Sequence, residues 1–239
     1  MLVREYMLQH PIMIEPHRRL FEAQRILVEN DLYYLPVVGD GKRLLGMITP
    51  PRLAVAPERL ASLDVWEISH YLQHLTVDKV MLKGAELATI SPTHTLEEAA
   101  EVMLHSRTGG LPVVEQGLVR GLITDHDLLI EFRNLLGAVE PGWRVTVRVP
   151  SRKGEFLRLT RVIIENDWGL MAMGNVRAPR APQQWDIVLK VTGPSREELI
   201  AAIGQNAGHE LRDIRATLQF NEDTGRRWNA SRNGNQHEE

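Results

Sequence analysis

Apolar and polar positions recur along the first 135 residues as two similar units. Leu35-Pro36-Val37-Val38 recurs as Leu111-Pro112-Val113-Val114, and Gly46-Met47-Ile48-Thr49 recurs as Gly121-Leu122-Ile123-Thr124. The offset is 76 residues for the first pair and 75 for the second. Self-similarity at a fixed period indicates a duplicated structural unit. Each unit is predicted to run strand, helix, strand, turn, strand, helix.

The second unit shows each predicted element most clearly. Thr95 and Glu98 are spaced as a capping box at the start of an amphipathic helix. Two apolar runs flank Glu115-Gln116-Gly117, which is typical of a hairpin turn. The predicted elements are a strand at Leu87–Ile90, a helix with Leu96, Ala99, Val102 and Met103 on one face, and strands at Leu111–Val114 and Leu118–Ile123; the first unit matches with Leu20, Ala23, Ile26 and Leu27, then a turn at Gly39-Asp40-Gly41.

Residues 57–77, between the units, carry apolar side chains at helical spacing, with Asp64 as a predicted N-cap. Glu67, His70 and His74 share one face of this helix. A His-x-x-x-His pair can ligate a metal, and the alternative is a solvated helix face with two surface histidines. No partner ligand pair is evident, so we predict no metal site.

Residues 143–219 follow a different pattern. Polar and apolar positions alternate strictly over Trp143–Val149, as in a half-buried strand. The further predicted elements are a helix after Gly154 carrying Phe156, Leu159 and Ile163 and ended by Gly169, strands at Leu170–Val176 and Trp185–Val191, a helix capped by Ser195 and Glu198, and a last strand at Leu211–Leu218. The order βαββαβ predicts a ferredoxin-like sandwich.

Composition excludes several classes of chemistry. The chain has 239 residues, no cysteine and a net charge of −3. Disulfides, thiol nucleophiles and cysteine-ligated zinc are therefore excluded, and the charge does not favour a nucleic-acid partner. No signal peptide is evident, and no apolar run reaches the length of a membrane span. We expect a cytoplasmic protein that does not contact membranes.

The most informative stretch lies where the second Gly-x-x-Thr run ends. Thr124 and Asp127 are spaced as a capping box, so a helix is predicted to begin here. The start of a helix leaves backbone N–H groups unpaired and carries partial positive charge, which together favour a phosphate. The Asp127 carboxylate, one turn in, could accept hydrogen bonds from a ribose diol.

This duplicated unit, with its Leu-Pro-Val-Val and Gly-x-x-Thr-x-x-Asp runs, resembles a tandem pair of cystathionine-β-synthase (CBS) domains, a Bateman module. The resemblance implies a pseudo-twofold pair whose clefts bind adenosine compounds, often AMP, ADP, ATP or S-adenosylmethionine, and it implies a homodimer. It implies that Asp127 holds the ribose hydroxyls and that Thr124 contacts phosphate. The candidate nucleotide-binding residues are Ala88, Ser91, Thr108, Gly109, Gly110, Thr124, Asp125 and Asp127.

The first repeat departs from this pattern. Arg52 stands where the second repeat has Asp127, and Tyr33-Tyr34 stand where it has Gly109-Gly110. Two interpretations stay open: this cleft is empty, or Arg52 reaches the phosphate of a nucleotide in the other cleft. We predict one competent site per chain.

The C-terminal region resembles an ACT domain, and the whole order resembles the CBS–ACT proteins of the bacterial acetoin-utilisation family. The resemblance implies that the ACT-like domain binds a small effector or dimerises. The loop Pro150–Gly154 keeps the family's glycine but lacks its acid, which favours dimerisation. Arg144, Arg148 and Lys190 on the open sheet face could attract an anion or RNA, but no stacking aromatic accompanies them. A solvated or dimer-facing sheet is the better interpretation.

The predicted architecture is therefore α/β and α+β, a CBS pair followed by a ferredoxin-like ACT-type domain. The predicted segments are CBS repeat 1 at 1–56, a connecting helical segment at 57–77, CBS repeat 2 at 78–137, the ACT-like domain at 143–219 and a disordered polar tail at 220–239. The leading hypothesis is a non-catalytic regulator of an unidentified target enzyme, without a required cofactor. The alternatives are a structural dimerisation module and a metal-assisted hydrolase that uses Asp125, His126 and Asp127.

Overall fold

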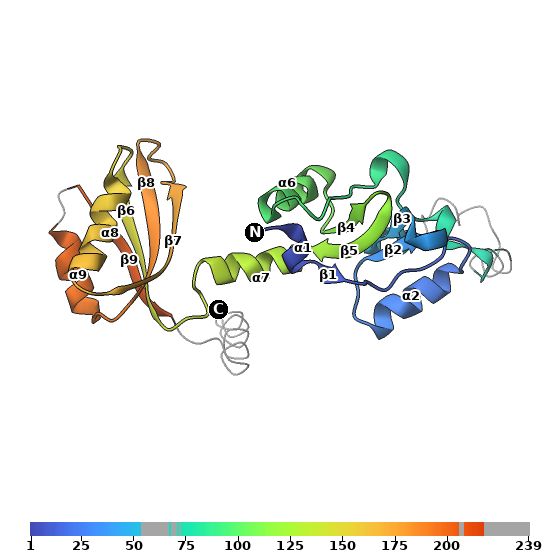
Figure 1. The fold of residues 1–239 in the computed structure, drawn as a ribbon, viewed down its shortest axis with the longest axis horizontal. Coiled ribbons are helices and arrows are strands. Elements are labelled where there is room, and N and C mark those ends of the chain that lie inside the picture. Colours follow the sequence, from blue (N-terminus) through green and yellow to red (C-terminus); the bar gives the residue numbers. More distant parts are fainter. Residues whose placement is uncertain (54–66, 68–70, 72, 206–207, 218–239) are drawn as a thin grey trace, which may run out of the picture. The chain divides into compact units, whose positions relative to one another are not determined.

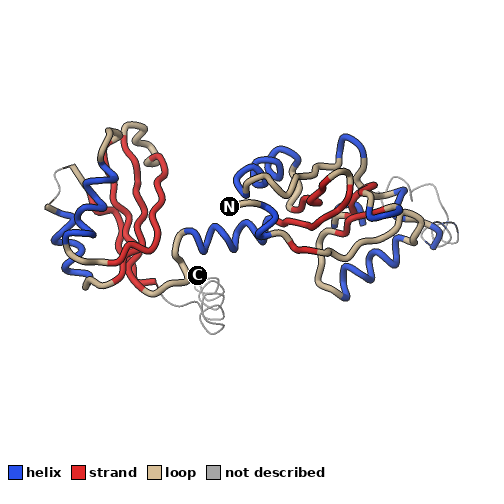
Figure 2. The backbone as a smooth tube through the Cα atoms, viewed as in Figure 1, coloured by secondary structure: helices blue, strands red, loops and turns tan. Residues whose placement is uncertain are grey.

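The computed structural model describes residues 1–53, 67, 71, 73–205 and 208–217 (Figure 1). The chain divides into two compact units, Met1–Leu129 and Ile130–Glu239. Each unit combines helices with strands (Figure 2). Much of the predicted connecting helix, with Asp64 and His70, and the predicted tail at 220–239 lie outside the described residues.

Unit 1 holds two short sheets and the helices that cover them. Its helices are α1 (Val3–Tyr6), α2 (Leu20–Glu29), α3 (Pro50–Leu53), α6 (Leu96–Ser106) and the start of α7 (Asp125–Leu135), with the 3-10 turns η1 (Asp40–Lys42), η2 (Val77–Lys79) and η3 (Gly84–Glu86). Its strands are β1 (Leu8–Gln9), β2 (Leu35–Val38), β3 (Leu44–Ile48), β4 (Gly110–Glu115) and β5 (Leu118–Thr124).

The duplication read from the sequence is a structural duplication. β2 pairs with β3 and β4 pairs with β5, both antiparallel, and the pairing register shifts after Val37 in one hairpin and after Val113 in the other. In the second hairpin, Gln116 and Gly117 both have positive φ, as a tight two-residue turn requires. The predicted capping box of Thr95 and Glu98 is present at the start of α6.

The predicted strand at Leu87–Ile90 is wrong, because only one bridge forms there. Ile90 pairs with Val113 in parallel, donating its N–H to the Pro112 carbonyl and accepting from the Val114 N–H. A longer ladder would need an N–H from Pro112, which proline lacks.

Each sheet in unit 1 is completed by residues near the start of the other repeat. β1 pairs with β5 in the second repeat, whereas Leu82 bridges to Met47 in the first. Gly121 and Gly46 explain this close approach, because a Cβ at Gly121 would lie 2.9 Å from the Leu8 carbonyl oxygen and one at Gly46 would lie 2.6 Å from that of Leu82. The two repeats are therefore interlocked rather than separate domains.

The buried residues of unit 1 form one core for each repeat. The first core holds Ile14, Leu20, Ala23, Leu27, Leu35, Val37, Ile48, Leu75 and Val77; the second holds Val3, Ile90, Leu96, Ala99, Met103, Leu111, Val113 and Ile123. The cores show the same exchange between the repeats. Val3, near the start of the first repeat, packs in the second core, and Val77, at the start of the second repeat, packs in the first.

Unit 2 has the predicted βαββαβ order. Its elements are β6 (Gly142–Pro150), α8 (Glu155–Glu165), β7 (Gly169–Arg177), β8 (Gln184–Thr192), α9 (Arg196–Gly204) and β9 (Glu210–Thr217). The sheet order is β7-β8-β6-β9 and every neighbouring pair is antiparallel. Figure 1 shows α8 and α9 on the same face of this sheet. Side chains of both helices and of the central strands form the core.

Two details of unit 2 differ from the sequence prediction. The helix predicted to end at Gly169 ends at Glu165, because Asp167 takes the left-handed conformation with φ of 56°. Lys190 is not a solvated cation on the open face: its side chain is 2% exposed and its Nζ has no hydrogen-bond partner within the described residues. Arg148 is held by Asp186 at 2.7 Å and Arg144 by Asp213 at 3.4 Å.

Candidate functional site

The start of α7 is built as the sequence predicts. The Thr124 N–H and hydroxyl both donate to Oδ2 of Asp127, at 2.8 and 2.7 Å, and the Asp127 N–H donates to the Thr124 hydroxyl at 3.3 Å. These three hydrogen bonds fix the Asp127 carboxylate at the helix tip. The second carboxylate oxygen, Oδ1, makes no hydrogen bond within the described residues, so it is available to a ligand.

The expectation of open backbone N–H groups at this helix start is wrong. The Asp125 N–H donates to the Gly109 carbonyl at 2.8 Å, and the His126 N–H donates to Oδ1 of Asp125 at 2.8 Å. With the Asp127 N–H held by Thr124, the first three amides of α7 all have partners. A phosphate would have to displace these internal acceptors.

A cleft of about 710 Å³ opens beside this helix start. Thr124, Asp125 and Asp127 line it on the side of the second repeat, and Tyr33 and Tyr34 line it on the side of the first. The full lining is Leu8, Asp31, Leu32, Tyr33, Tyr34, Leu122, Thr124, Asp125, His126, Asp127 and Leu129. Three of the eight candidate residues therefore meet in one cleft, joined by first-repeat residues that the sequence did not single out as ligand contacts.

Gly109 and Gly110 lie directly against the Tyr34 side chain. A Cβ at Gly110 would lie 2.6 Å from the Tyr34 ring, so only glycine fits there without movement of the ring. The two positions are equivalent in the repeats, 76 residues apart, and they meet across the pair. Tyr34 therefore covers the diglycine surface that we expected to line a nucleotide.

The Tyr34 hydroxyl lies in a negative environment. Burial raises the pKa of Tyr34 and the charge of Asp125 raises it further, while a hydrogen bond from Gly109 acts in the opposite direction. The Tyr34 hydroxyl therefore loses its proton only at a higher pH than an ordinary tyrosine, and it lies between the first repeat and the Asp125 end of the cleft.

The other candidate residues do not line this cleft. Ala88 is half-buried against the second core. Ser91 contacts the Thr93 hydroxyl at 3.0 Å, and Thr108 donates from its hydroxyl to the Gly110 carbonyl at 3.2 Å. These side chains stabilise the turns that precede α6 and β4.

Arg52 is engaged elsewhere. Its guanidinium contacts the Glu86 carboxylate at 2.7 Å and does not line the cleft of the second repeat. The residue at the position that corresponds to Asp127 therefore forms an ion pair with Glu86, near the start of the second repeat.

In the described part of the chain, no three or more histidine, cysteine, aspartate or glutamate side chains lie together in a way that suits a metal ion. Nor does any described helix combine the length and apolar character of a membrane span.

Comparison with known proteins agrees with the duplicated architecture. The CBS domain model matches residues 3–56 and again residues 77–134. A CBS domain-containing protein of Dictyostelium discoideum is 30% identical over 151 residues, which cover 59% of this chain and 97% of that protein. The chain belongs to the CBS-domain family. Its first 134 residues are accordingly a CBS pair.

Solved structures of CBS pairs resemble the same part of the chain. A Vibrio cholerae protein assigned to acetoin utilisation is 28% identical, with a TM-score of 0.47 over 57% of this chain and 93% of its own. The Arabidopsis thaliana CBS-pair protein CBSX2, solved with AMP, is 21% identical, with a TM-score of 0.47 over 56% of this chain and 96% of its own.

The chain covers half or less of the first curated relatives. It spans 47%, 32% and 23% of the first three, the third an inosine-5′-monophosphate dehydrogenase of Halalkalibacterium halodurans. CBS pairs thus occur both in proteins named for this domain alone and within enzymes.

Proposed function

We propose that this CBS pair is a non-catalytic regulatory module that binds an adenosine-containing effector, of the AMP, ADP and ATP class, in the cleft of the second repeat. The observation that carries the proposal is the Asp127 carboxylate. One of its oxygens is fixed by Thr124, and the other has no hydrogen-bond donor among the described residues, beside a cleft of about 710 Å³. A carboxylate held in this way can accept both hydroxyls of a ribose.

In this proposal each candidate residue has a distinct role. Asp127 binds the ribose, and Thr124 orients Asp127 and contacts the 5′ substituent. Asp125 lies beside the Tyr34 hydroxyl, so it couples the ligand to the first repeat. The Gly109-Gly110 backbone would become a ligand contact only if Tyr34 moves off it, and Ala88, Ser91 and Thr108 stay proposed contacts beside it.

That movement gives the proposal a regulatory step. Tyr34 belongs to the first repeat and packs on the second, so a ligand that displaces its ring alters the contact between the repeats. A ligand can shift such an equilibrium only by binding the two arrangements with different affinity. The regulated partner in this proposal is an enzyme.

We propose that unit 2 serves dimerisation, as in an ACT-like domain. β7 is an edge strand of nine residues, and Leu170, Met171, Met173 and Val176 on it are at least 38% exposed. Long exposed apolar edge strands readily pair with another chain. Effector binding at the β6–α8 loop is less favoured, because the buried Glu155 carboxylate that follows the loop is already bound by Arg152 and His209, each at 2.7 Å.

Neither alternative function is favoured by a specific observation. For the metal-assisted hydrolase, Asp125 and Asp127 would have to leave the helix cap that they form. For the purely structural module, the cleft would have no occupant. The structural module predicts that adenosine ligands leave the stability of the chain unchanged, whereas the hydrolase predicts bound metal together with nucleotide turnover.

The test is the thermal stability of the full chain with millimolar AMP, ADP, ATP and other adenosine compounds. A ligand that binds only the folded state stabilises it by about 2.7 kcal/mol at one hundred times its dissociation constant. We expect at least one compound to raise the melting temperature of the wild type and to leave that of Asp127→Ala unchanged. A melting temperature indifferent to every adenosine compound would contradict the proposal.

A further inference from the structure

Helix α8 has one face in the core of unit 2 and an opposite face that is exposed. Leu159 and Ile163 are buried in the core, whereas Ile164 is 73% exposed. This is the largest exposed fraction among the described apolar side chains of unit 2. Single exposed apolar side chains are common and need no explanation by themselves. The residues around Ile164 are what make this face informative.

Two opposite charges flank Ile164 on the exposed face. Residues three and four apart are neighbours on a helix surface, so Arg161 lies beside both Ile164 and Glu165. Neither Arg161 nor Glu165 forms a side-chain hydrogen bond or an ion pair with another described residue. A cation followed four residues later by an acid is the less favourable order for a pair within one helix. Both charges are therefore available to a partner.

The position of Glu165 does not favour the helix itself. Glu165 is the last residue of α8, and the last turn contains no basic residue. The C-terminal end of a helix carries partial negative charge, which favours lysine or arginine and disfavours glutamate. A residue that breaks a local rule in this way is expected at a functional surface, where it serves something other than local stability.

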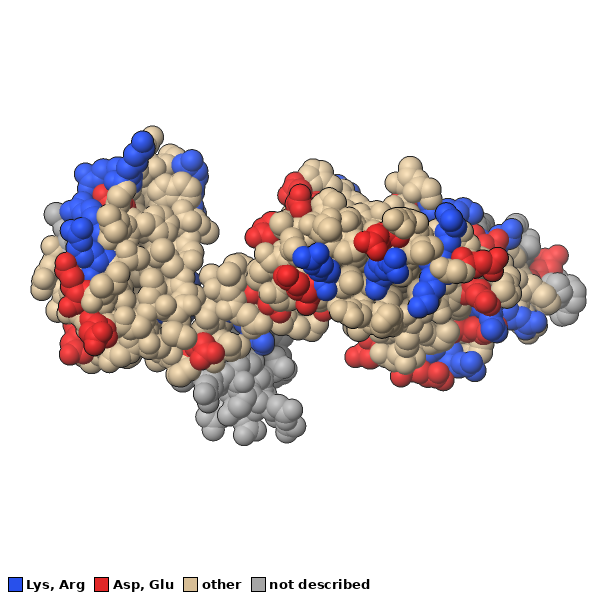
Figure 3. Space-filling view, in the orientation of Figure 1, with Lys and Arg blue, Asp and Glu red and all other residues tan. Residues whose placement is uncertain are grey.

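A hollow beside this face offers room for side chains of a partner. It lies between α8 and α9, has a volume of about 570 Å³, and is lined by Arg161 and Glu165 on one side and by Ala201 and Ala202 on the other. The short alanine side chains leave the hollow open. Figure 3 shows Lys and Arg in one group and Asp and Glu in another along the helix-covered side of unit 2. The surface thus has a basic part and an acidic part.

We propose that α8 packs on α8 of a second copy of this chain, antiparallel across a twofold axis near Ile164, so that Arg161 of each copy pairs with Glu165 of the other. A twofold contact uses the same surface on both copies, so each pair forms twice. Ile164 of the two copies meet near the axis. One helix supplies both members of the ion pair, so a second copy complements this surface without any other chain.

This contact goes beyond the proposed function and does not use the β7 edge. β7 lies at one edge of the sheet, whereas α8 covers a face of it (Figure 1). A chain that associates through α8 alone forms a dimer. A chain that also pairs through β7 forms a tetramer. In either case, loss of the α8 contact halves the mass of the assembly.

The test is sedimentation equilibrium of the full chain over a series of concentrations. Arg161→Glu places an acid opposite Glu165 of the second copy, and Glu165→Arg places a base opposite its Arg161. Because like charges across an interface are strongly unfavourable, we expect each variant to raise the dissociation constant of this step at least about tenfold. Both side chains are exposed, so circular dichroism should show an unchanged fold.

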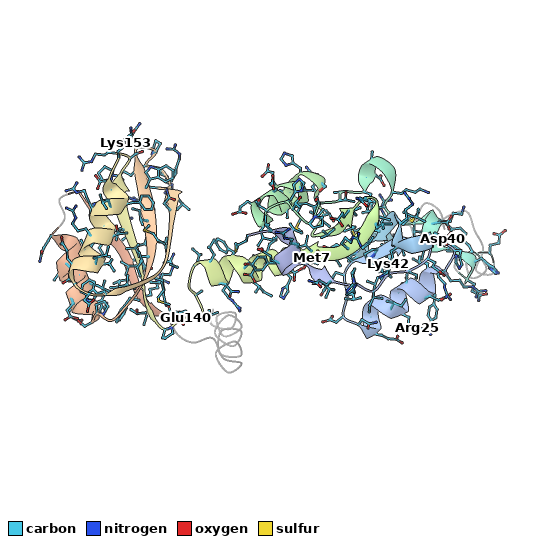
Figure 4. All side chains as sticks on the ribbon, viewed as in Figure 1. Met7, Arg25, Asp40, Lys42, Glu140 and Lys153 are labelled. Atoms are coloured by element: carbon cyan, nitrogen blue, oxygen red, sulfur yellow. The ribbon has the colours of Figure 1, made fainter. Side chains whose placement is uncertain are left out.

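A mixture of the two variants separates ion pairing from a general loss of association. The Arg161→Glu chain has acids at both positions and the Glu165→Arg chain has bases at both, so a mixed pair has two attractive contacts. We expect an equimolar mixture to recover the mass of the wild type. The control Lys153→Glu reverses an exposed charge in the loop before α8, at the tip of unit 2 in Figure 4, and should keep the wild-type mass.

The outcomes decide between the two contacts of unit 2. Wild-type mass in both single variants, a mixture that fails to recover, or an equal loss in Lys153→Glu would each overturn the α8 contact. A dimer that persists in every variant would leave the β7 contact standing. A wild type that stays monomeric at every concentration would overturn both contacts. None of these results bears on adenosine binding, which the melting temperature tests separately.

Discussion

The two repeats of the CBS pair share a scaffold but differ at the helix start that follows each Gly-x-x-Thr run. In the second repeat, Thr124 fixes Asp127 and leaves one carboxylate oxygen without a hydrogen bond from any described residue. In the first, Arg52 occupies the corresponding position and forms an ion pair with Glu86. The helix start survives the change because Pro50 begins α3, and proline is well suited to the first position of a helix.

The difference separates what the fold requires from what a ligand requires. Hairpins, parallel bridges and glycine close approaches are present in both repeats, so they serve the scaffold. The free carboxylate is present in one repeat only. A residue that differs between two otherwise equivalent halves is a better indication of a binding site than a residue that both halves keep.

The largest expected effect concerns the glycine and tyrosine at equivalent positions. Gly110→Ala places a Cβ 2.6 Å from the Tyr34 ring and should destabilise the chain by about 2 kcal/mol through overpacking. Urea unfolding measures the loss. The control is Gly204→Ala in α9, where the added Cβ meets no atom within 4 Å and stability should hold. If Gly110→Ala were as stable as this control, the tight packing of the repeats would be refuted.

A second comparison removes the same hydroxyl from each repeat. Thr124→Val deletes the group that exchanges two hydrogen bonds with Asp127 and should cost about 1 kcal/mol, as for other lost helix caps. Thr49→Val changes the equivalent residue, whose hydroxyl has no hydrogen bond within the described residues, and should be close to neutral. Chemical denaturation measures the free energy of unfolding of both variants. Equal losses of stability would mean that the Thr124 cap contributes nothing specific.

A smaller effect is expected from the ion pair between Arg52 and Glu86. Arg52→Ala removes the contact with Glu86, but the two side chains are 41% and 61% exposed. Exposed pairs contribute at most about 1 kcal/mol, so stability should fall by less than that. The fall should shrink further in high salt, because salt screens exposed charges. A loss that is larger and independent of salt would mean that Arg52 has a buried role.

The smallest effect is a change in one pKa. Asp125→Asn should lower the pKa of Tyr34, since the Asp125 charge raises it. Ultraviolet titration, with Tyr34→Phe subtracted to isolate this tyrosine, measures the change, and Asp40→Asn serves as control. Because the folded pKa lies above the unfolded one, Tyr34 stabilises the fold fully below pH 10 and loses this contribution as the pH rises through its folded pKa. An unchanged pKa in Asp125→Asn would separate Tyr34 from the cleft.

The sequence predicted most of the secondary structure because local signals carry it. Alternation predicted β6, and the capping boxes at Thr95, Thr124 and Ser195 predicted three helix starts. The misses are local conflicts: Pro112 cannot donate to a longer opening strand, and Asp167 ends its helix before Gly169.

The candidate site was predicted only in part, because half of it comes from the other repeat. The motif around Asp127 was visible in the chain. The contact between Tyr34 and Gly110 was not, since nothing local brings residues 76 apart together. The offset between the repeats was the available signal: equivalent positions near a pseudo-twofold axis face one another.

The most direct test of the account is the stoichiometry of adenosine-ligand binding by isothermal titration of the full chain, the Asp127→Ala variant and the Arg52→Ala variant. The account predicts one site per chain, lost in Asp127→Ala and unchanged in Arg52→Ala. Two sites per chain, or binding that survives in Asp127→Ala and disappears in Arg52→Ala, would contradict it.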